Sequence, residues 1–344
     1  MRILVGISGG LDSAYAARKL LNEGHEVEGA VLVMHDYTEV DSAKSVAAEL
    51  GITLHTVDCR ERFSAVIDNF IGEYCNARTP NPCIICNPLV KFRCLLDYAS
   101  EHGFDMIATG HYARVVKAVC DGEERFTLKR SRDAKKDQTY MLYRLPQEIL
   151  SKLCLPLMDE VKSEIRELAY RDGLSVAERK ESQEICFIPD GDYASYIENR
   201  VGKFPEGDFV DAEGKAIGRH KGIIRYTLGQ RKGLGVAAGD RIFVTDIDPV
   251  SNVITLSKDG STTSLLRVTD IVFSGIGEPV AGTSMDVSVK LRYQAPMVPA
   301  TVVFDGNGGA TVTLGEPQRA VTPGQSAVMY KDDMLLFGGF ISKI

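Results

Sequence analysis

A glycine-rich hexapeptide near the N-terminus constrains the fold more than any other feature of the chain. Ser8-Gly9-Gly10-Leu11-Asp12-Ser13 directly follows an apolar, β-branched run from Arg2 to Ile7 and precedes apolar residues at helical spacing. Glycines let the backbone approach phosphate oxygens without a Cβ clash, and the free N–H groups at a helix start face the anion. The hexapeptide lacks the Gly-Lys-Ser/Thr ending of a Walker A loop. We therefore predict a phosphate site of a different strand–loop–helix type.

Strand-like and helix-like segments alternate through residues 1–199. Strands are expected at Arg2–Ile7, Val27–Met34, Thr53–Val57 and Asp105–Thr109, and helices at Asp41–Leu50, capped by Asp41 and stopped by Gly51, and around Phe63–Phe70. This order predicts an α/β fold with a parallel sheet and helices on both faces, in which ligands bind at the carboxyl ends of the strands. Three prolines between Thr79 and Pro88 predict a loop, after which a helix resumes at Leu89.

The pattern of hydrophobic residues changes after about Arg200. Short alternating runs replace helical periodicity, at Arg241–Ile247, Val253–Leu256, Val287–Tyr293, Pro299–Phe304 and Ala310–Leu314. Short strands separated by turn signals are typical of a β-barrel or sandwich. Since 344 residues exceed one hydrophobic core, we predict three domains: a nucleotide-binding catalytic domain at 1–199, a small central domain at 200–262 and a C-terminal β-barrel at 263–344.

Composition places the chain among ordinary globular proteins, with 44% hydrophobic and 25% charged residues. No apolar run is long enough to span a membrane, and the N-terminus does not resemble a signal peptide. We therefore expect a cytoplasmic protein with no membrane partner. The formal net charge of −7 means that a nucleic-acid partner would have to be held by local basic patches.

The eight cysteines suggest metal binding or catalysis, because thiols stay reduced in the cytosol. Cys83 and Cys86 enclose two residues of the proline-rich loop, and Cys186 lies about a hundred positions later in Glu184-Ile185-Cys186-Phe187-Ile188. Cys75, Cys83, Cys86 and Cys94 are symmetrically spaced and form an alternative, a structural zinc site. The remaining three, Cys59, Cys120 and Cys154, are expected to be ordinary core or surface thiols.

Several sequence strings together resemble the tRNA 2-thiouridylases, which belong to the ATP pyrophosphatases and make 2-thiouridine at the wobble base. They are Ser8 to Ser13, Arg78-Thr79-Pro80-Asn81-Pro82, Cys86-Asn87 with Lys91-Phe92, Ala108 to Ala113, Lys136-Asp137-Gln138, Ile185 to Ile188, Tyr226 to Gly235, Arg292-Tyr293 and Thr322 to Val328. The resemblance covers nearly the whole chain. Asparagine, GMP and NAD synthetases use similar loops, so the loop alone leaves another ATP-dependent ligase or amidase open; such an enzyme would not need the cysteines.

The resemblance implies a reaction in two stages. ATP, used with Mg²⁺, adenylates the C2 oxygen of uridine, and a sulfur nucleophile then replaces that oxygen. Cys186 would carry the sulfur as a persulfide received from a cysteine desulfurase or a sulfur-relay protein. Cys86 would be the nucleophile that releases this sulfur as hydrosulfide or closes a transient Cys86–Cys186 disulfide after transfer. We expect a lowered pKa for both thiols, since thiolates are the working species.

The resemblance also assigns the binding residues. The ATP site would consist of Gly6, Ile7, Ser8, Gly9, Gly10, Leu11, Asp12, Ser13, Met34 and Gly110. The tRNA with its wobble uridine would meet Asn81, Pro82 and Cys83 at the target base, and Lys136, Asp137, Gln138, Arg292 and Tyr293 elsewhere. Arg292 and Tyr293 are expected on a barrel strand, where cation and ring suit phosphate contact and base stacking. Arg231 and Lys232 are expected to touch the RNA backbone, and His111 to be a hydrogen-bonding scaffold residue.

Cys83 departs from the family pattern, which has an aspartate at this position as the proposed acid/base partner of the nucleophile. The resulting set of Cys83, Cys86 and Cys186 matches the three thiolates of a [4Fe–4S] cluster with one open iron. The sequence leaves the persulfide relay and the cluster as equal alternatives.

Overall fold

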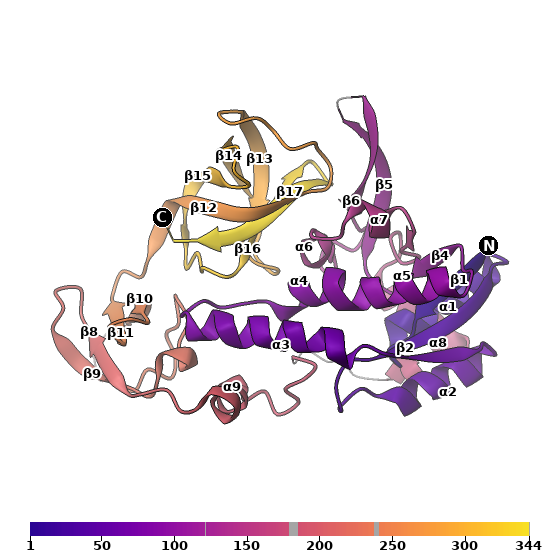
Figure 1. Cartoon of the computed structure of the whole chain (residues 1–344), viewed down its shortest axis with the longest axis horizontal. Coiled ribbons are helices and arrows are strands. Elements are labelled where there is room, and N and C mark those ends of the chain that lie inside the picture. Colours follow the sequence, from indigo (N-terminus) through magenta and orange to yellow (C-terminus); the bar gives the residue numbers. More distant parts are fainter. Residues whose placement is uncertain (121, 179–184, 237–240, 344) are drawn as a thin grey trace.

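A parallel five-stranded sheet forms the N-terminal part of the computed structural model, which describes residues 1–120, 122–178, 185–236 and 241–343 (Figure 1). The strands are β1 (Arg2–Gly6), β2 (Glu26–Val33), β3 (Leu54–Asp58), β4 (Met106–Ala108) and β7 (Leu153–Cys154), in the order β3-β2-β1-β4-β7. Every pairing between neighbours is parallel. The predicted sheet is confirmed, and each expected strand lies within a few residues of its place.

Helices cover both faces of this sheet. Ile3 and Val5 pack with buried residues of α1 (Leu11–Asn22), α2 (Val40–Leu50) and α8 (Lys162–Arg171), whereas Leu4 packs with those of α3 (Arg60–Cys75) and α5 (Phe92–Glu101). Successive side chains of a strand point to opposite faces, so β1 joins two hydrophobic layers. The predicted cap of α2 is wrong by two positions: Glu39 is the N-cap and Asp41 lies in the first turn. Gly51 ends α2 in the left-handed conformation, as expected.

The proline-rich segment is helical from Pro82 onward, so the predicted loop is wrong except at residues 79–81. Pro82–Cys86 forms α4, and a π-helical turn at Asn87–Lys91 continues directly into α5. Pro82 is tolerated because the first turn of a helix needs no N–H from it, and the Asn81 side chain caps α4 by accepting from the Cys83 backbone N–H at 3.2 Å. Pro88 falls in the wider π turn, a device that interrupts the regular hydrogen-bond spacing.

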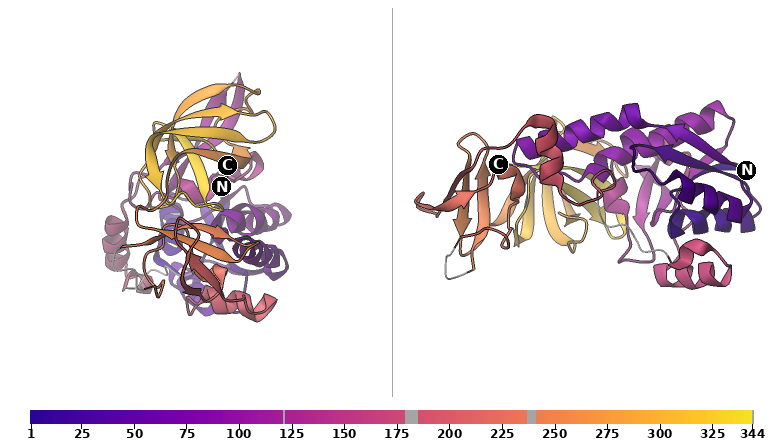
Figure 2. Two further views of the ribbon diagram at one scale, coloured as in Figure 1. Left: turned by 90° about the vertical axis from the view of Figure 1, so that its left-hand side faces the viewer. Right: turned by 90° about the horizontal axis from the view of Figure 1, so that it is seen from below.

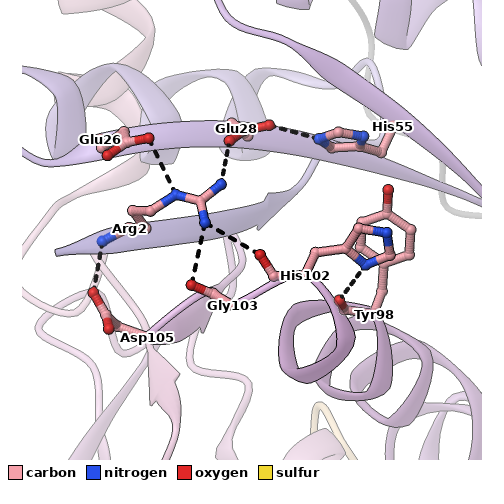
Figure 3. Close-up of polar contacts among 8 residues, drawn as sticks. All are labelled: Arg2, Glu26, Glu28, His55, Tyr98, His102, Gly103 and Asp105. Atoms are coloured by element: carbon pink, nitrogen blue, oxygen red, sulfur yellow. Dashed lines mark hydrogen bonds and ion pairs between the residues drawn. The ribbon is translucent and has the colours of Figure 1, made fainter.

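A network of charged groups joins the amino ends of the strands, at the edge opposite the glycine-rich loop (Figure 3). The Arg2 guanidinium donates to Glu28 at 2.9 Å and to Glu26 at 3.1 Å, while its backbone N–H donates to Asp105. His55 lies 2.6 Å from the other oxygen of Glu28. Because these contacts tie β1, β2 and β3 to the segment before β4, they stabilise the strand order.

A second, four-stranded sheet follows α9 (Tyr193–Val201). Its strands are β8 (Gly207–Val210), β9 (Ala216–His220), β10 (Phe243–Asp248) and β11 (Val253–Ser257), in the order β10-β11-β8-β9. Figures 1 and 2 show this small sheet and the N-terminal sheet at opposite ends of the longest axis. The remaining short elements are α6 (Thr139–Leu142), α7 (Gln147–Leu150) and the 3₁₀ turns Ser175–Glu178 and Ile223–Arg225.

A closed six-stranded barrel forms the C-terminal part. It consists of β12 (Thr262–Phe273), β13 (Ser284–Lys290), β14 (Val298–Phe304), β15 (Ala310–Arg319), β16 (Ser326–Lys331) and β17 (Met334–Ser342), and pairing of β12 with β17 closes the ring. The predicted barrel is confirmed. Arg292 and Tyr293 are not on a barrel strand, because β13 ends at Lys290 and both residues lie in the connection to β14.

The barrel is attached to the N-terminal part by buried hydrogen bonds and a strand pairing. A hairpin of β5 (Ala113–Cys120) and β6 (Glu123–Arg130) pairs with the start of β17, where Lys129 lies opposite Met334. Thr139 of α6 lies 3.0 Å from the Tyr330 hydroxyl, and the Tyr140 hydroxyl donates to the Ser326 carbonyl at 3.0 Å. The two parts therefore share one packed interface next to Gln138. No described helix is long and apolar enough to cross a membrane.

Candidate active site

The glycine-rich loop is packed tightly between neighbouring elements. Gly9 has a φ of 77°, and a Cβ there would lie 2.5 Å from the Ser42 Cβ. A Cβ on Gly110, after β4, would lie 2.5 Å from the carbonyl carbon of Asp12. Ser13 Oγ donates to the Gly10 carbonyl and accepts from the Ser8 backbone N–H. These contacts hold the start of α1 open at the carboxyl edge of the sheet, where its N–H groups can bind an anion.

Asp12 is held by two residues that the sequence did not single out for this role. Lys162 Nζ at the start of α8 lies 2.6 Å from Asp12 Oδ1, and the Tyr112 hydroxyl donates to the same oxygen at 2.7 Å. The Lys162 side chain is only 10% exposed. A nearly buried lysine beside a phosphate loop supplies a positive charge where a nucleotide's phosphates would lie.

One large cavity, of about 1650 Å³, connects the loop with the cysteines and with the barrel. Of the predicted site residues, its lining includes Gly6, Ile7, Ser8, Gly10, Leu11, Asp12, Ser13, Met34, Cys83, Gly110, Lys136, Asp137, Gln138, Cys186 and Tyr293. Gly9, Asn81, Pro82, Cys86 and Arg292 lie outside this lining. The structure thus gathers residues more than 280 positions apart, from Gly6 to Tyr293, around one space.

The three thiols of interest lie near one another, but they are not activated in the way we expected. Cys86 is buried, with its Sγ 3.9 Å from the Met34 Sδ, whereas Cys83 and Cys186 are exposed to the cavity. Burial raises the pKa of Cys86 to about 12, the nearby Lys91 lowers it, and Cys83 and Cys186 raise it. Desolvation likewise raises the pKa of Cys186 to about 11. The predicted lowering of both pKa values is therefore wrong.

Neither predicted metal site has the geometry of a ligand set within the described ranges. No group of three or more cysteine, histidine or carboxylate side chains there is placed to hold a metal ion. Cys94, one of the four thiols of the zinc alternative, instead accepts a hydrogen bond from Cys59, which lowers its pKa. The side chain of Cys120 lies outside the described part of the chain.

The predicted tRNA contacts differ in accessibility. Asp137 is 2% exposed, and its carboxylate accepts from the Ser131 backbone N–H at 3.2 Å and the Thr139 hydroxyl at 2.8 Å. Gln138 accepts from the Tyr112 backbone N–H at 2.9 Å. Asp137 and Lys136 both line the cavity, but the Asp137 carboxylate is nearly buried and is held by its neighbours.

The exposed cations of the predicted RNA surface lie on loops. Arg292, Arg231 and Lys232 are all exposed. His111, in contrast, is half-buried beside the loop, with its Nδ1 2.8 Å from the Thr109 hydroxyl, and desolvation of its ring lowers its pKa well below the usual value. This contact agrees with the scaffold role expected for it.

Comparison with known proteins identifies the family. Family models described as a tRNA methyl transferase HUP domain, a tRNA methyl transferase PRC-barrel domain and an aminomethyltransferase β-barrel domain match residues 1–190, 194–258 and 263–341. A tRNA-specific 2-thiouridylase MnmA 1 of Clostridium botulinum is 43% identical over 99% of both chains. The chain belongs to the tRNA-specific 2-thiouridylase family.

A further relative agrees with this membership. A tRNA-specific 2-thiouridylase MnmA of Treponema denticola is 41% identical, covering 100% of this chain and 98% of its own. Among solved structures, a 4-thiouridine synthetase–RNA complex with bound ATP matches 58% of this chain and 50% of its own, at 16% identity and a TM-score of 0.36. As a 2-thiouridylase family member the chain is a sulfurtransferase with an ATP-pyrophosphatase fold, which separates it from the ligases and amidases that share the loop.

Proposed function

We propose that the protein uses ATP to replace the C2 oxygen of a wobble uridine in tRNA with sulfur, carried as a persulfide on Cys186. The observation that carries this proposal is the cavity lined by both the phosphate loop and Cys186, together with the nearness of Cys186 to Cys86, whose pKa it raises. Family membership supports the substrate, because the relatives are named tRNA-specific 2-thiouridylases.

The first stage activates the uridine. The C2 oxygen attacks the α-phosphorus of ATP, pyrophosphate leaves, and the oxygen becomes part of an adenylate. The N–H groups at the start of α1 and the Lys162 ammonium would hold the phosphates. Two donors use Asp12 Oδ1, and Oδ2 has no hydrogen bond from a described residue, which fits the single carboxylate that Mg²⁺–nucleotide complexes commonly use. Bound Mg²⁺ would neutralise charge on the phosphates.

The second stage transfers sulfur. The terminal sulfur of the Cys186 persulfide attacks C2, and AMP leaves with the former carbonyl oxygen. The Cys86 thiolate then attacks the Cys186 Sγ, so that the sulfur–sulfur bond breaks and its electron pair stays on the sulfur bound to C2. The products are 2-thiouridine and a Cys86–Cys186 disulfide, which a cellular thiol must reduce. In the alternative order, Cys86 attacks first and releases hydrosulfide, which then attacks C2.

The raised pKa values are consistent with this sequence. A persulfide on Cys186 brings its own sulfur nucleophile, so the Cys186 thiol does not have to ionise during transfer. Cys86 must lose its proton only for the resolving step, and the positive charge of Lys91 favours its thiolate. Buried, protonated Cys86 is thereby protected from oxidation between turnovers.

The target base must leave its stack to reach the thiols. Asn81, Pro82 and Cys83 form the start of α4 beside Cys86, and we assign them to the flipped base. Lys136, Arg292 and Tyr293 would hold the surrounding RNA, with Arg231 and Lys232 on its backbone. A cysteine desulfurase or a sulfur-relay protein of the cytoplasm would load Cys186.

The reaction with sulfide on a [4Fe–4S] cluster is the alternative, and the residues do not fit it. Cys83 and Cys186 both lie near enough to raise the pKa of Cys86, yet the three thiols form no ligand group in the described structure. We therefore assign no step to a cluster, and Cys83 acts here as a wall of the base pocket.

The test is reconstitution with ATP, Mg²⁺, a persulfide source and an unmodified tRNA that carries a wobble uridine. Mass spectrometry of the digested tRNA should detect 2-thiouridine with the wild-type protein and none with Cys86→Ser or Cys186→Ser. Cys154→Ser is the matched control, because Cys154 lies on β7 outside the cavity lining, and it should keep full activity. Thiolation by Cys86→Ser would remove the resolving role, and no product from the wild type would overturn the function.

A further inference from the structure

Lys290 is a nearly buried lysine that the reaction just described does not use. It is the last residue of β13, is 8% exposed, and lines the cavity from the barrel side. Its ammonium lies 5.6 Å from the centre of the Tyr293 ring. Its Nζ makes no hydrogen bond or ion pair with any residue in the described part of the chain. Lysines are almost never buried without a partner, so this position needs an explanation.

The charges around Lys290 leave an excess of positive charge. Two groups act on it across the interface: the Asp137 carboxylate raises its pKa and the Arg130 guanidinium lowers it, while burial has the largest effect and also lowers it. Arg130 Nε lies 3.7 Å from Asp137 Oδ2 and is itself buried without a hydrogen-bond partner within the described structure. Two cations therefore share one carboxylate.

That carboxylate is already satisfied by other donors. Asp137 accepts from Ser131 and Thr139, and Thr139 in turn contacts Tyr330 of the barrel. A carboxylate held in this way cannot move to form a close pair with Lys290. An ammonium that is desolvated, unpaired and open to a cavity is arranged for an anionic ligand, since the ligand would supply the missing charge.

We propose that Lys290 binds a phosphate group of the substrate, and that this group is a phosphodiester of the RNA next to the reacting uridine. The proposal rests on the proposed function for the identity of the RNA. Two observations favour RNA over ATP as the source of the phosphate. Lys290 ends a barrel strand and lies beside Tyr293 of the following connection, where a cation beside a ring suits a phosphate and its stacked base. The ATP phosphates have a loop and a lysine of their own at Asp12.

This assignment gives the barrel a direct part in the site. Lys290 and Tyr293 reach the cavity from the C-terminal barrel, while the loop and the thiols come from the N-terminal part. RNA bound by Lys290 would therefore be held by the barrel's side of the same cavity that Cys83 and Cys186 line.

The experiment measures tRNA affinity of the full-length Lys290→Met variant as a function of salt concentration. Methionine keeps the length and packing of the side chain and removes its charge. We expect the dissociation constant for tRNA to rise about 3- to 10-fold and the slope of log K against log salt to fall by about one. ATP affinity should stay within about twofold of the wild type, and thermal stability should be unchanged or higher, because an unpaired buried charge is removed.

Two further variants make the result decisive. Lys290→Arg restores the charge and should restore the salt slope. Lys152→Met is the matched control, since Lys152 is an exposed lysine beside Asp105 at the opposite edge of the sheet, and it should leave tRNA affinity and slope unchanged.

Each other outcome overturns part of the proposal. A loss of ATP affinity with an unchanged tRNA slope would assign the phosphate to ATP and remove the RNA contact. Unchanged binding of both substrates, or a fall in melting temperature that Lys290→Arg repairs without a binding defect, would make Lys290 a structural cation. Failure of the wild-type protein to bind or thiolate tRNA would refute the proposed function itself, and it is seen without any variant.

Discussion

Gly110→Ala tests whether the phosphate loop needs the close approach of β4. The added methyl group would lie 2.5 Å from the carbonyl carbon of Asp12, 2.6 Å from its oxygen and 2.8 Å from the Ser13 nitrogen. Carbon atoms pack favourably at about 3.5–4.0 Å, so the backbone must shift by about 1 Å to accept it. All three atoms belong to the backbone, so no side-chain rotation can relieve the clash.

The shift has two measurable costs. Overpacking of this kind costs about 1–3 kcal/mol, which lowers the melting temperature by about 2–12 °C in a domain of this size. Displacing a positioning element by about 1 Å typically lowers catalytic rate about 100-fold. We therefore expect Gly110→Ala to be folded, with ATP affinity reduced at least tenfold by calorimetry and tRNA thiolation reduced about 100-fold.

Gly72→Ala is the matched control. Gly72 lies within α3 and a Cβ there would meet nothing within 4 Å, so alanine should raise helix stability by about 0.5–1 kcal/mol without changing ATP affinity. If Gly110→Ala had the melting temperature and ATP affinity of the wild type, the close approach and its role in shaping the loop would both be refuted.

Three further predictions address the thiols and the charged edge. Alkylation of Cys186 by iodoacetamide, followed by peptide mass spectrometry, should accelerate about tenfold per pH unit between pH 7 and 10, because its pKa is raised to about 11; a plateau below pH 9 would contradict this. Cys83→Asp should retain tRNA thiolation. Wild-type protein purified without oxygen should contain no iron or labile sulfide, whereas about four irons per chain would support the [4Fe–4S] alternative. Glu28→Gln should lose about 1–3 kcal/mol of unfolding free energy in urea at pH 7, whereas Glu26→Gln, at a more exposed contact with the same arginine, should lose little. Because His55 and then Arg2 lower the pKa of Glu28, its contribution is present above about pH 4.3 and is lost as the pH falls through the folded pKa; an equal difference between wild type and variant at pH 7 and pH 3 would contradict the ion pairs.

Features that depend on local periodicity could be predicted from the sequence. The loop after β1, four strands of the parallel sheet and three strands of the barrel form close to where their patterns place them, whereas β7, β12, β16 and β17 were not predicted. The prediction of a loop around Pro82 and Pro88 was wrong because it assumed that proline always breaks a helix. Its effect depends on position: Pro82 begins a helix that Asn81 caps, and a π turn accommodates Pro88.

The electrostatic environment of the thiols could not be predicted, because it comes from residues distant in sequence. The charge state of Cys86 depends on its burial against Met34, which β2 places there from 52 positions away. A sequence motif shows that a thiol is present, but it does not show how exposed that thiol is to solvent in the folded protein. We expected a lowered pKa because the reaction needs a thiolate, but in the structure the burial of Cys86 has the largest effect on its pKa.

The same reason explains why Lys162 and Lys290 were missed. Neither lysine stands in a motif, and on the sequence each is one of 40 basic residues. Lys162 becomes significant because α8 returns its ammonium to within 2.6 Å of Asp12, 150 positions earlier. Lys290 becomes significant because α6 and β16 bring the barrel against Asp137 and exclude water. The role of each of these lysines therefore depends on the charges that the fold places beside it. Lys290, which has no ion-pair partner among the described residues, is proposed as a substrate contact on that basis, and no sequence pattern encodes it.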